Sequence, residues 1–440
     1  MAAQQSSVSM RGAVRRVAAI PADERGTWRS AMRKQPERDA FPINELGTRT
    51  GADKAAGATH LSPMHSTTHL DRRQWLKATG VAFAGLALAS RLPLRVQAAP
   101  AADRAPETSG PVQLSLNENP FGPSPRALAA MQQELPRVHR YPFNKTPELV
   151  KLIAEREGVP ADHILLGVGS GEILETYGVY LGRQRGEVIT VSPGYMQMTQ
   201  AMERMGSRIV AVPLNARLEH DLPAMAAKVT ADTKAVYLCN PNNPSGTIVE
   251  PARLRDFAIE VSKKVPVFID EAYLQCSDDF AANTMVGLVR DGHNVTVART
   301  FSKIYGLAGQ RIGYGIMQPA MAEALRVFMT GSVNLLGVVA ARASLEDETY
   351  VEATRLKIKA GRDALIGVLK ELGRRYAEPQ GNFVFFHTGI PIAEFQRRMR
   401  AENVIVARPF APLLEWCRIS IGTPAEMAVA HAALRKVLAV

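Results

Sequence analysis

The residue with the clearest capacity for chemistry is Lys303, which follows the apolar run 295–298 and precedes a Gly-rich stretch. An amine placed just beyond a buried strand is shielded from bulk water, and desolvation lowers its pKa and makes it a nucleophile toward aldehydes. Its neighbours Thr300, Ser302 and Arg311 have side chains that can donate hydrogen bonds to a phosphate. On this stretch alone a solvated loop lysine is the simpler interpretation, so the elements that position Lys303 decide the matter.

Strands and helices alternate along residues 146–334, the part of the chain that contains Lys303. Six nearly continuous apolar runs in this part predict strands: 164–166, 186–191, 208–213, 233–239, 265–269 and 295–298. Strands that are apolar on both faces are typical of a mostly parallel sheet that helices cover on each side. The pattern therefore predicts an α/β fold with a large, doubly wound domain.

A smaller domain of the α+β class is predicted for residues 335–440. Long helical patterns follow residue 335, and the apolar runs 382–386 and 417–421 predict two strands with a helix between them. The segment 99–145 begins as a Pro/Ala linker and continues into an extended Pro-rich stretch. We expect this segment to join the smaller domain.

The residues at the carboxyl ends of the strands are the candidates for a site, because ligands of open α/β sheets bind there. Ser170 and Gly171 follow the first strand and open a helix, whose exposed N–H groups and dipole favour a phosphate. A dinucleotide site would use similar glycines, but the Gly-x-Gly-x-x-Gly spacing is missing and no acidic residue follows at about 20 residues. A phosphate site is the better interpretation.

The other strand ends carry a flat ring, hydrogen-bond donors and a carboxylate. Tyr195 is suited to stacking on a flat cofactor, and Asn243 and Tyr273 are suited to donating to a phenolate oxygen. Asp270 ends a buried strand, where a carboxylate is costly without a cationic partner such as a protonated pyridine nitrogen. Together with Lys303, these groups meet the requirements of pyridoxal phosphate.

The basic residues of the chain are concentrated at its start, which excludes a nucleic-acid-binding surface on the body of the protein. Residues 1–98 hold 15 Lys+Arg against 7 Asp+Glu, a net charge of +8, whereas the remainder carries +3 of the total of +11. Residues 1–63 mix Ala, Arg, Gly and Pro without a sustained period. We expect them to be disordered, or to precede the true start codon at Met64.

An export signal over residues 64–98 accounts for part of this basic excess. Arg72 and Arg73 form the pair of a twin-arginine signal, and the mild apolar run 81–89 follows it. Residues 96–98 end in the small residue Ala98 and resemble the cleavage site of a signal peptide. The apolar run is too short to span a bilayer, which takes about 20 residues, so no stable membrane anchoring is expected. We expect export to the periplasm, or a cytoplasmic location if the signal is not used.

The sequence resembles the fold-type I pyridoxal-phosphate enzymes, specifically the class I/II aminotransferases, and is most similar to the histidinol-phosphate aminotransferase family. The likeness covers about 113–436 and rests on these stretches: 116–125, 140–142, 167–172, 240–247, 270–273, 300–313, 380–383 and 418–423. The resemblance implies the fold of these transferases, with a large mostly parallel sheet domain and a smaller α+β domain.

By position, the resemblance implies Lys303, Asp270 and Tyr273 as the catalytic residues. Lys303 would bind the cofactor covalently and act as general base, and Asp270 would face the pyridine nitrogen. Tyr141 would reach the phosphate of the neighbouring subunit, so a homodimer is implied. The further cofactor contacts that it implies are Ser170, Gly171, Tyr195, Asn243, Thr300, Ser302 and Arg311.

The activity that the resemblance implies is transamination in two half-reactions, from an amino donor to a 2-oxo acid such as 2-oxoglutarate. Arg418 would bind the anionic group of the substrate, with Arg408 and Asn119 beside it. Histidinol phosphate or an aromatic amino acid is the expected donor. No metal and no nucleic acid are expected as partners.

Two positions depart from the usual pattern of the family. Phe143 stands where an acidic residue is frequent after Tyr-Pro, and Gly171 stands where an aspartate is common. Export also fits poorly with histidine biosynthesis, which is a cytoplasmic task, so the substrate stays open. Two other functions stay open as well: a decarboxylase or lyase on the same scaffold, because fold does not fix reaction, and a non-catalytic cofactor-binding protein.

Overall fold

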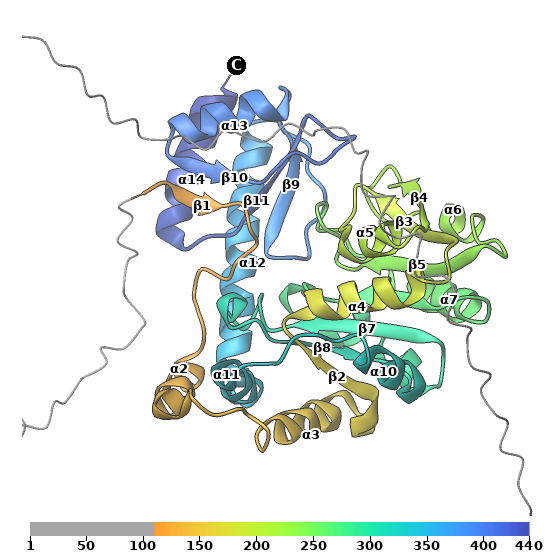
Figure 1. Cartoon of the computed structure of the whole chain (residues 1–440). Coiled ribbons are helices and arrows are strands. Elements are labelled where there is room, and N and C mark those ends of the chain that lie inside the picture. The colour runs from red at the N-terminus through yellow and green to blue at the C-terminus, as the bar shows by residue number, and fades with distance from the viewer. Residues whose placement is uncertain (1–109, 440) are drawn as a thin grey trace, which may run out of the picture. The chain divides into compact units, whose positions relative to one another are not determined.

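The computed structural model describes residues 110–439 (Figure 1). The predicted export signal at 64–98, the preceding residues 1–63 and the first part of the segment 99–145 lie outside this range. No helix among the described residues combines the length and the apolar character needed to cross a membrane.

A seven-stranded sheet forms the centre of the larger part, as the apolar runs predicted. In spatial order its strands are β2 (Ile164–Gly167), β8 (Gly313–Ile316), β7 (Val295–Thr300), β6 (Val267–Asp270), β5 (Thr233–Cys239), β3 (Glu187–Ser192) and β4 (Arg208–Pro213). Neighbours pair in parallel except at β8, which is antiparallel to both β2 and β7. The α/β class and the mostly parallel sheet are therefore confirmed, with β8 as a strand that the sequence analysis missed.

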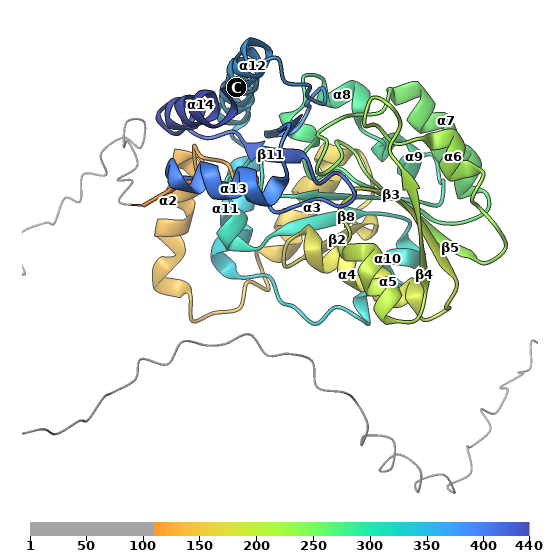
Figure 2. The same ribbon diagram turned by 90° about the horizontal axis from the view of Figure 1, so that it is seen from above.

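Helices cover both faces of this sheet, because successive side chains of a strand point in opposite directions. Val188 and its neighbour Ile189 on β3 belong to different hydrophobic cores, one on each face. One core packs against α4 (Ser170–Gly182), α5 (Gln197–Arg204) and α10 (Pro319–Arg326). The other packs against α3 (Thr146–Glu157), α7 (Pro251–Ser262), α9 (Val286–Arg290) and α11 (Leu335–Leu345). Figure 2 shows α4, α5 and α10 on one side of the sheet and α6 (Leu222–Ala226) and α7 on the other.

A smaller α+β part follows in sequence and has its own core. Its strands are β9 (Phe383–His387), antiparallel to β11 (Trp416–Ser420), and β10 (Val404–Val406), parallel to β1 (Val112–Leu114). Its helices are α12 (Glu348–Glu371), α13 (Ile392–Ala401) and α14 (Pro424–Leu438). The N-terminal strand β1 thus pairs with a strand almost 300 residues away in sequence and shares the core of this part.

The next helix, α2 (Pro125–Glu134), packs instead on α11, so the N-terminal segment contacts both parts. The remaining helical elements are short: η1 (Leu135–Arg137), η2 (Ala161–His163), η3 (Leu274–Cys276), α8 (Phe280–Asn283) and η4 (Ala308–Gln310). All strands of the large sheet except β8 point the same way, and β2, β3, β5, β6 and β7 end side by side at one edge with the chain segments that matter for the site. The chain segments that leave this edge build the site.

Candidate active site

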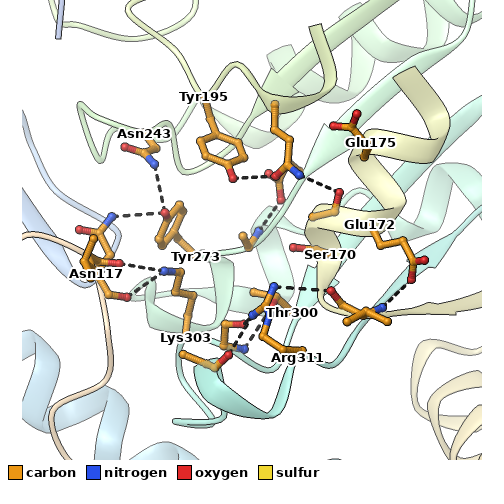
Figure 3. A pocket seen from close by; sticks show the side chains of 18 of the residues that line it. Asn117, Ser170, Glu172, Glu175, Tyr195, Asn243, Tyr273, Thr300, Lys303 and Arg311 are labelled. Carbon is orange, nitrogen blue, oxygen red and sulfur yellow. Dashed lines mark hydrogen bonds between the residues drawn. The ribbon is translucent and has the colours of Figure 1, made fainter. Parts of the chain in front are cut away.

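A cavity of about 850 Å³ lies where the carboxyl ends of the large sheet face the smaller part. Residues from both parts line it, and Figure 3 shows the side chains that converge there. The lining includes every predicted site residue except Tyr141 and Asn119, namely Ser170, Gly171, Tyr195, Asn243, Asp270, Tyr273, Thr300, Ser302, Lys303, Arg311, Arg408 and Arg418. Residues at five strand ends are therefore brought to one space.

Lys303 follows β7 and presents its amine to this cavity. Its Nζ donates to the backbone oxygens of Leu116 at 3.2 Å and Asn117 at 3.0 Å, and lies 5.4 Å from the centre of the Tyr273 ring. Burial and, to a lesser degree, the positive charge of Arg418 lower the pKa of Lys303 to about 8. About a tenth of this amine is therefore neutral, and hence nucleophilic, at neutral pH.

Asp270 is a buried carboxylate whose two hydrogen bonds come from uncharged groups. It is 2% exposed, and it accepts from the Ala272 N–H at 3.1 Å and from the Tyr237 hydroxyl at 3.2 Å. Among residues 110–439 no Lys or Arg forms an ion pair with it, and burial raises the pKa of Asp270 to about 6. A cationic group in the cavity would stabilise the carboxylate, which fits the protonated ring nitrogen of pyridoxal phosphate.

A group of residues suited to binding an anion lies in the cavity at the start of α4. We call this group, Thr300, Ser302, Arg311 and the first N–H groups of α4, the anion cradle. Gly169 precedes this helix with a φ of 79°, no side chain caps the helix, and an added Cβ would lie 2.4 Å from Nη2 of Arg311. Arg311 donates to the Ser302 hydroxyl at 3.3 Å, and the Thr300 hydroxyl accepts from the Ser302 N–H at 3.1 Å. Within the described chain Arg311 has no carboxylate partner. Free helix N–H groups beside an unpaired guanidinium and hydroxyls suit a phosphate.

Tyr195 flanks the same cavity, and its hydroxyl is held by a residue that the sequence analysis did not identify. It donates to Oε1 of Gln197 at 2.9 Å, and the amide of Gln197 in turn donates to the Gly171 oxygen at 3.0 Å. A Cβ added to Gly171 would lie 3.1 Å from that Gln197 oxygen. Burial raises the pKa of Tyr195 to about 12, so the phenol stays neutral.

Tyr273 and Asn243 lie together, as predicted, and are joined by Asn117, which was not predicted. Both amides donate to the Tyr273 hydroxyl oxygen, Asn243 at 3.1 Å and Asn117 at 3.2 Å (Figure 3). No local signal in the sequence distinguishes Asn117, because its contacts come from residues more than 150 positions away.

Arg418 on β11 is buried at the end of the cavity nearest the smaller part. Its Nη1 donates to Oδ1 of Asn243 and its Nη2 to the Ser115 oxygen at 2.6 Å, while Nε has no partner among the described residues. Its guanidinium lies 5.1 Å from the centre of the Phe410 ring, and Arg408 lies 4.7 Å from the same ring. Two guanidinium groups therefore converge on one aromatic ring, where an anionic substrate group could bind.

Two predicted residues do not line the cavity. Asn119 is buried, but its amide donates to the Ile304 oxygen at 2.8 Å and accepts from the Phe121 N–H at 3.0 Å, so its contacts are to backbone groups of neighbouring loops. Asn119 therefore holds two loops together and does not line the cavity, where it was expected to contact the substrate. Tyr141 is 73% exposed and stacks on Phe143, which is 79% exposed, at a centre-to-centre distance of 5.3 Å.

Known proteins with the same architecture are pyridoxal-phosphate enzymes. Residues 109–434 match the family described as aminotransferase class I and II. The histidinol-phosphate aminotransferase of Symbiobacterium thermophilum is 38% identical over 318 residues, which is 72% of this chain and 87% of that protein. The corresponding enzyme of Moorella thermoacetica is 37% identical over 334 residues, with 74% and 86% of the two chains covered.

A solved structure extends the likeness to the fold and the cofactor. The histidinol-phosphate aminotransferase of Sinorhizobium meliloti in complex with pyridoxal-5'-phosphate superimposes with a TM-score of 0.68 at 30% identity, covering 74% of this chain and 91% of the other. The family match spans nearly all the described residues, and the carboxylate and the anion cradle fit the cofactor. The chain therefore belongs to the pyridoxal-phosphate-dependent class I and II aminotransferases and groups among them with the histidinol-phosphate aminotransferases.

Proposed function

We propose that this aminotransferase takes the amino group of histidinol phosphate or an aromatic amino acid and passes it to a 2-oxo acid such as 2-oxoglutarate. The observation that carries the proposal is that one cavity brings Lys303 together with two arginines, Arg311 at the anion cradle and Arg418 on β11. One arginine would hold the cofactor phosphate and the other the anionic group of the substrate, so that the amine lies between them.

The residues at the strand ends would hold the cofactor. Arg311, Ser302 and the start of α4 would bind its phosphate, Asp270 its ring nitrogen, and Asn243 with Tyr273 its ring oxygen. Tyr195 would pack against the ring. Bound pyridoxal phosphate supplies an aldehyde that joins amines covalently and a ring that accepts electrons from the bond broken at the substrate carbon.

Lys303 then has two tasks in this chain. Its Nζ would hold the cofactor between reaction cycles and, as a free amine, would accept the proton from the substrate Cα and donate it back to the reacting group. The lowered pKa of Lys303 keeps the amine available as a base. Asp270, being buried, would stabilise positive charge on the ring nitrogen more strongly than an exposed carboxylate could.

The choice of donor is supported by two features. The relatives described above are named histidinol-phosphate aminotransferases, and two arginines beside Phe410 fit a strongly anionic group such as a phosphate ester. The ring of Phe410 lines the cavity and adds an apolar wall. An aromatic donor would use the same ring.

A donor screen on purified residues 99–440 loaded with pyridoxal phosphate tests the proposal. Histidinol phosphate, phenylalanine and histidine are compared with 2-oxoglutarate as acceptor, and glutamate formation is measured. Arg418→Met should lower kcat/KM for the anionic donor at least about 100-fold, since a buried charged contact is lost. Arg435→Met, which removes an exposed arginine of α14 paired with Glu371, is the control.

The outcome of the screen decides between the functions. Turnover of histidinol phosphate supports the proposal, and turnover of phenylalanine alone restricts it to aromatic donors. Inactivity toward histidinol phosphate would remove that substrate. Release of carbon dioxide without need for a 2-oxo acid would favour the decarboxylase instead, and bound cofactor without any turnover would favour a non-catalytic protein.

We propose further that the protein is exported through the twin-arginine pathway and cleaved after Ala98. The support is the order of the Arg72–Arg73 pair, the mild apolar run and the small-residue site in the sequence. Replacing both arginines by lysine should retain the protein in the cytoplasm, and peptide sequencing of the exported form should begin at Ala99. Peptides from residues 1–63 in cells would contradict a start at Met64.

We also propose that the enzyme acts as a homodimer in which Tyr141 reaches the cofactor phosphate of the neighbouring subunit. The support is the exposure of the Tyr141–Phe143 pair, since stacked aromatic rings left in solvent are typical of an interface. Light scattering of the purified enzyme measures the oligomeric state.

A further inference from the structure

We infer that Asn117 is a positioning residue, whose side-chain amide fixes the Tyr273 hydroxyl so that the phenolic proton points into the cavity. Asn117 belongs to residues 115–119, which we call the N-terminal strap. This inference rests on the proposed function, because it assigns the proton of Tyr273 to the cofactor that the cavity is proposed to hold. It adds a residue of the N-terminal segment to the site residues that follow the strands of the large sheet.

Every polar atom of Asn117 has a hydrogen-bond partner. Its N–H donates to the Ser420 hydroxyl at 2.9 Å, its Oδ1 accepts from that hydroxyl at 3.1 Å, and its Nδ2 donates to Tyr273 at 3.2 Å. Its carbonyl oxygen accepts from Lys303 and from Asn382, both at 3.0 Å. The residue is 1% exposed, so each of these bonds is made away from bulk water.

The backbone of Asn117 explains why an asparagine stands here. Its φ is 55°, in the left-handed region that asparagine tolerates better than most side chains. Glycine would also adopt this conformation but would leave Tyr273 and Ser420 without their partner. The combination of backbone and side-chain requirements favours asparagine.

The hydrogen-bond network fixes which end of the amide faces Tyr273. The Ser420 hydroxyl accepts from the Asn117 N–H, and its own proton goes to Oδ1 of Asn117. If the amide were turned around, this buried hydroxyl proton would have no acceptor among the described residues, which is costly. The NH₂ group of Asn117 therefore faces Tyr273.

Asn243 approaches Tyr273 in the same way, from the other side. Its Oδ1 accepts from Arg418, which has donors only, so its NH₂ group faces the phenol. The Tyr273 oxygen thus accepts from two amides, and its two lone pairs are used. Its proton has no acceptor in the described part of the chain and is free for an acceptor in the cavity; Figure 3 shows the two amides at the phenol oxygen.

The strap couples this donor to the reactive lysine. The carbonyl oxygens of Leu116 and Asn117 hold Nζ of Lys303, while the Asn117 side chain holds Tyr273. Asn117 therefore helps to set the direction of the phenolic proton and, together with Leu116, the position of the amine. Either group would lose its orientation if the strap moved.

The test is a double-mutant cycle on holoenzyme with Asn117→Asp and Tyr273→Phe. Aspartate keeps the size and conformation of Asn117 but offers an acceptor where the amide offered a donor, so it should draw the Tyr273 proton away from the cavity. The readout is the pH midpoint of the visible absorption of bound pyridoxal phosphate. Loss of a hydrogen-bond donor and gain of a negative charge should raise this midpoint by about one pH unit or more in Asn117→Asp.

The cycle separates the routes by which Asn117 could act. The shift should shrink by about half or more in the Tyr273→Phe background, because only the effect of the negative charge remains once the phenolic proton is absent. An equal shift in both backgrounds, or no shift in either, would overturn the inference. Ser420→Ala serves as a second variant if Asn117→Asp fails to fold: it frees the amide to turn and should give a smaller upward shift with the same dependence on Tyr273.

Failure of the proposed function would look different. Wild-type protein that binds no pyridoxal phosphate, or binds it without transaminating any donor, would remove the function before the cycle is measured. A working wild-type enzyme with an additive cycle would keep the function and remove only the role of Asn117.

Discussion

Lys303 owes its reactivity to where it lies more than to its neighbours in sequence. Burial and the charge of Arg418 both lower the pKa of its amine, to about 8, whereas an exposed lysine has a pKa near 10.4. Because a neutral amine is needed to attack an aldehyde, the rate of covalent binding of pyridoxal phosphate to cofactor-free protein should rise as pH increases. We expect about a tenfold gain per pH unit below 8 and a plateau above it, measured by stopped-flow absorbance.

Two variants check the assignment of this profile. Lys303→Ala should show no covalent phase at any pH. Arg418→Met should shift the plateau to higher pH, since a positive charge that favours the neutral amine is removed. A wild-type profile that is still rising steeply at pH 9.5 would contradict a lowered pKa for Lys303.

His220 supplies a second prediction at the scale of one residue, and it concerns stability. The ring is 2% exposed, neither nitrogen has a partner among the described residues, and burial lowers its pKa to about 4. The unfolded chain, with a pKa of about 6.5, therefore binds the proton first as pH falls. Stability should be complete above pH 6.5 and decline toward pH 4, by about 3 kcal/mol at most.

Urea unfolding at pH 7.5 and at pH 5 measures this loss. His220→Leu cannot be protonated, so the stability of wild type relative to this variant should fall between the two pH values. A difference between the two proteins that is independent of pH would exclude His220 as the cause.

The residues of the site were predictable from the sequence to different degrees. Asp270 and Lys303 could be recognised because one ends an apolar strand and the other follows one, and the edge at which parallel strands end is fixed by the fold. Asn117 could not, since its partners Ser420 and Tyr273 come from two other parts of the chain. Asn119, two residues along the same stretch, was expected at the substrate but bonds to loop backbone.

At the scale of elements, α4 and α5 pack so closely that glycine is required between them. An added Cβ on Gly178 would lie 2.5 Å from the Met198 oxygen and 2.7 Å from the Ala201 Cβ. Gly178→Ala should therefore destabilise the protein by about 1–3 kcal/mol, although alanine favours helix formation. The thermal midpoint should fall.

A glycine on α12 provides the matched control. Among residues 110–439 no atom lies within 4 Å of a Cβ added to Gly367, so Gly367→Ala should show only the gain in helix propensity, about 0.5–1 kcal/mol. The two substitutions are chemically identical and lie in helix interiors. If both raised or both lowered the thermal midpoint, close packing of α4 on α5 would not be the cause.

The elements that escaped prediction are short or depend on distant partners. Strand β8, Gly313–Ile316, alternates glycine with larger residues and carries no apolar run of its own, yet it fills the place between β2 and β7. Strands β1 and β10 have three residues each and exist because they pair with one another across the sequence. Long strands such as β5 were predictable because both of their faces are buried.

At the scale of the whole molecule, the exposed Tyr141–Phe143 pair is the feature that one chain leaves unexplained. Its exposure in a single chain and the proposed trans contact to the cofactor phosphate lead to the same expectation: a complete site needs two subunits. Neither Lys303→Ala nor Tyr141→Ala homodimers should then be fully active, for different reasons. The first lacks the amine in every site, and the second lacks the neighbouring tyrosine.

Mixing the two variants distinguishes a contact between subunits from a contact within one. If Tyr141 serves the neighbouring subunit, each heterodimer has one site with both Lys303 and Tyr141 intact and one site with neither. Random exchange of equal amounts should then restore roughly a quarter of the wild-type sites. If Tyr141 instead serves its own chain, every site with Lys303 lacks the tyrosine, and mixing restores nothing. Activity is measured after subunit exchange in dilute urea, with each variant treated alone as the control, so a recovery seen only in the mixture identifies the trans contact.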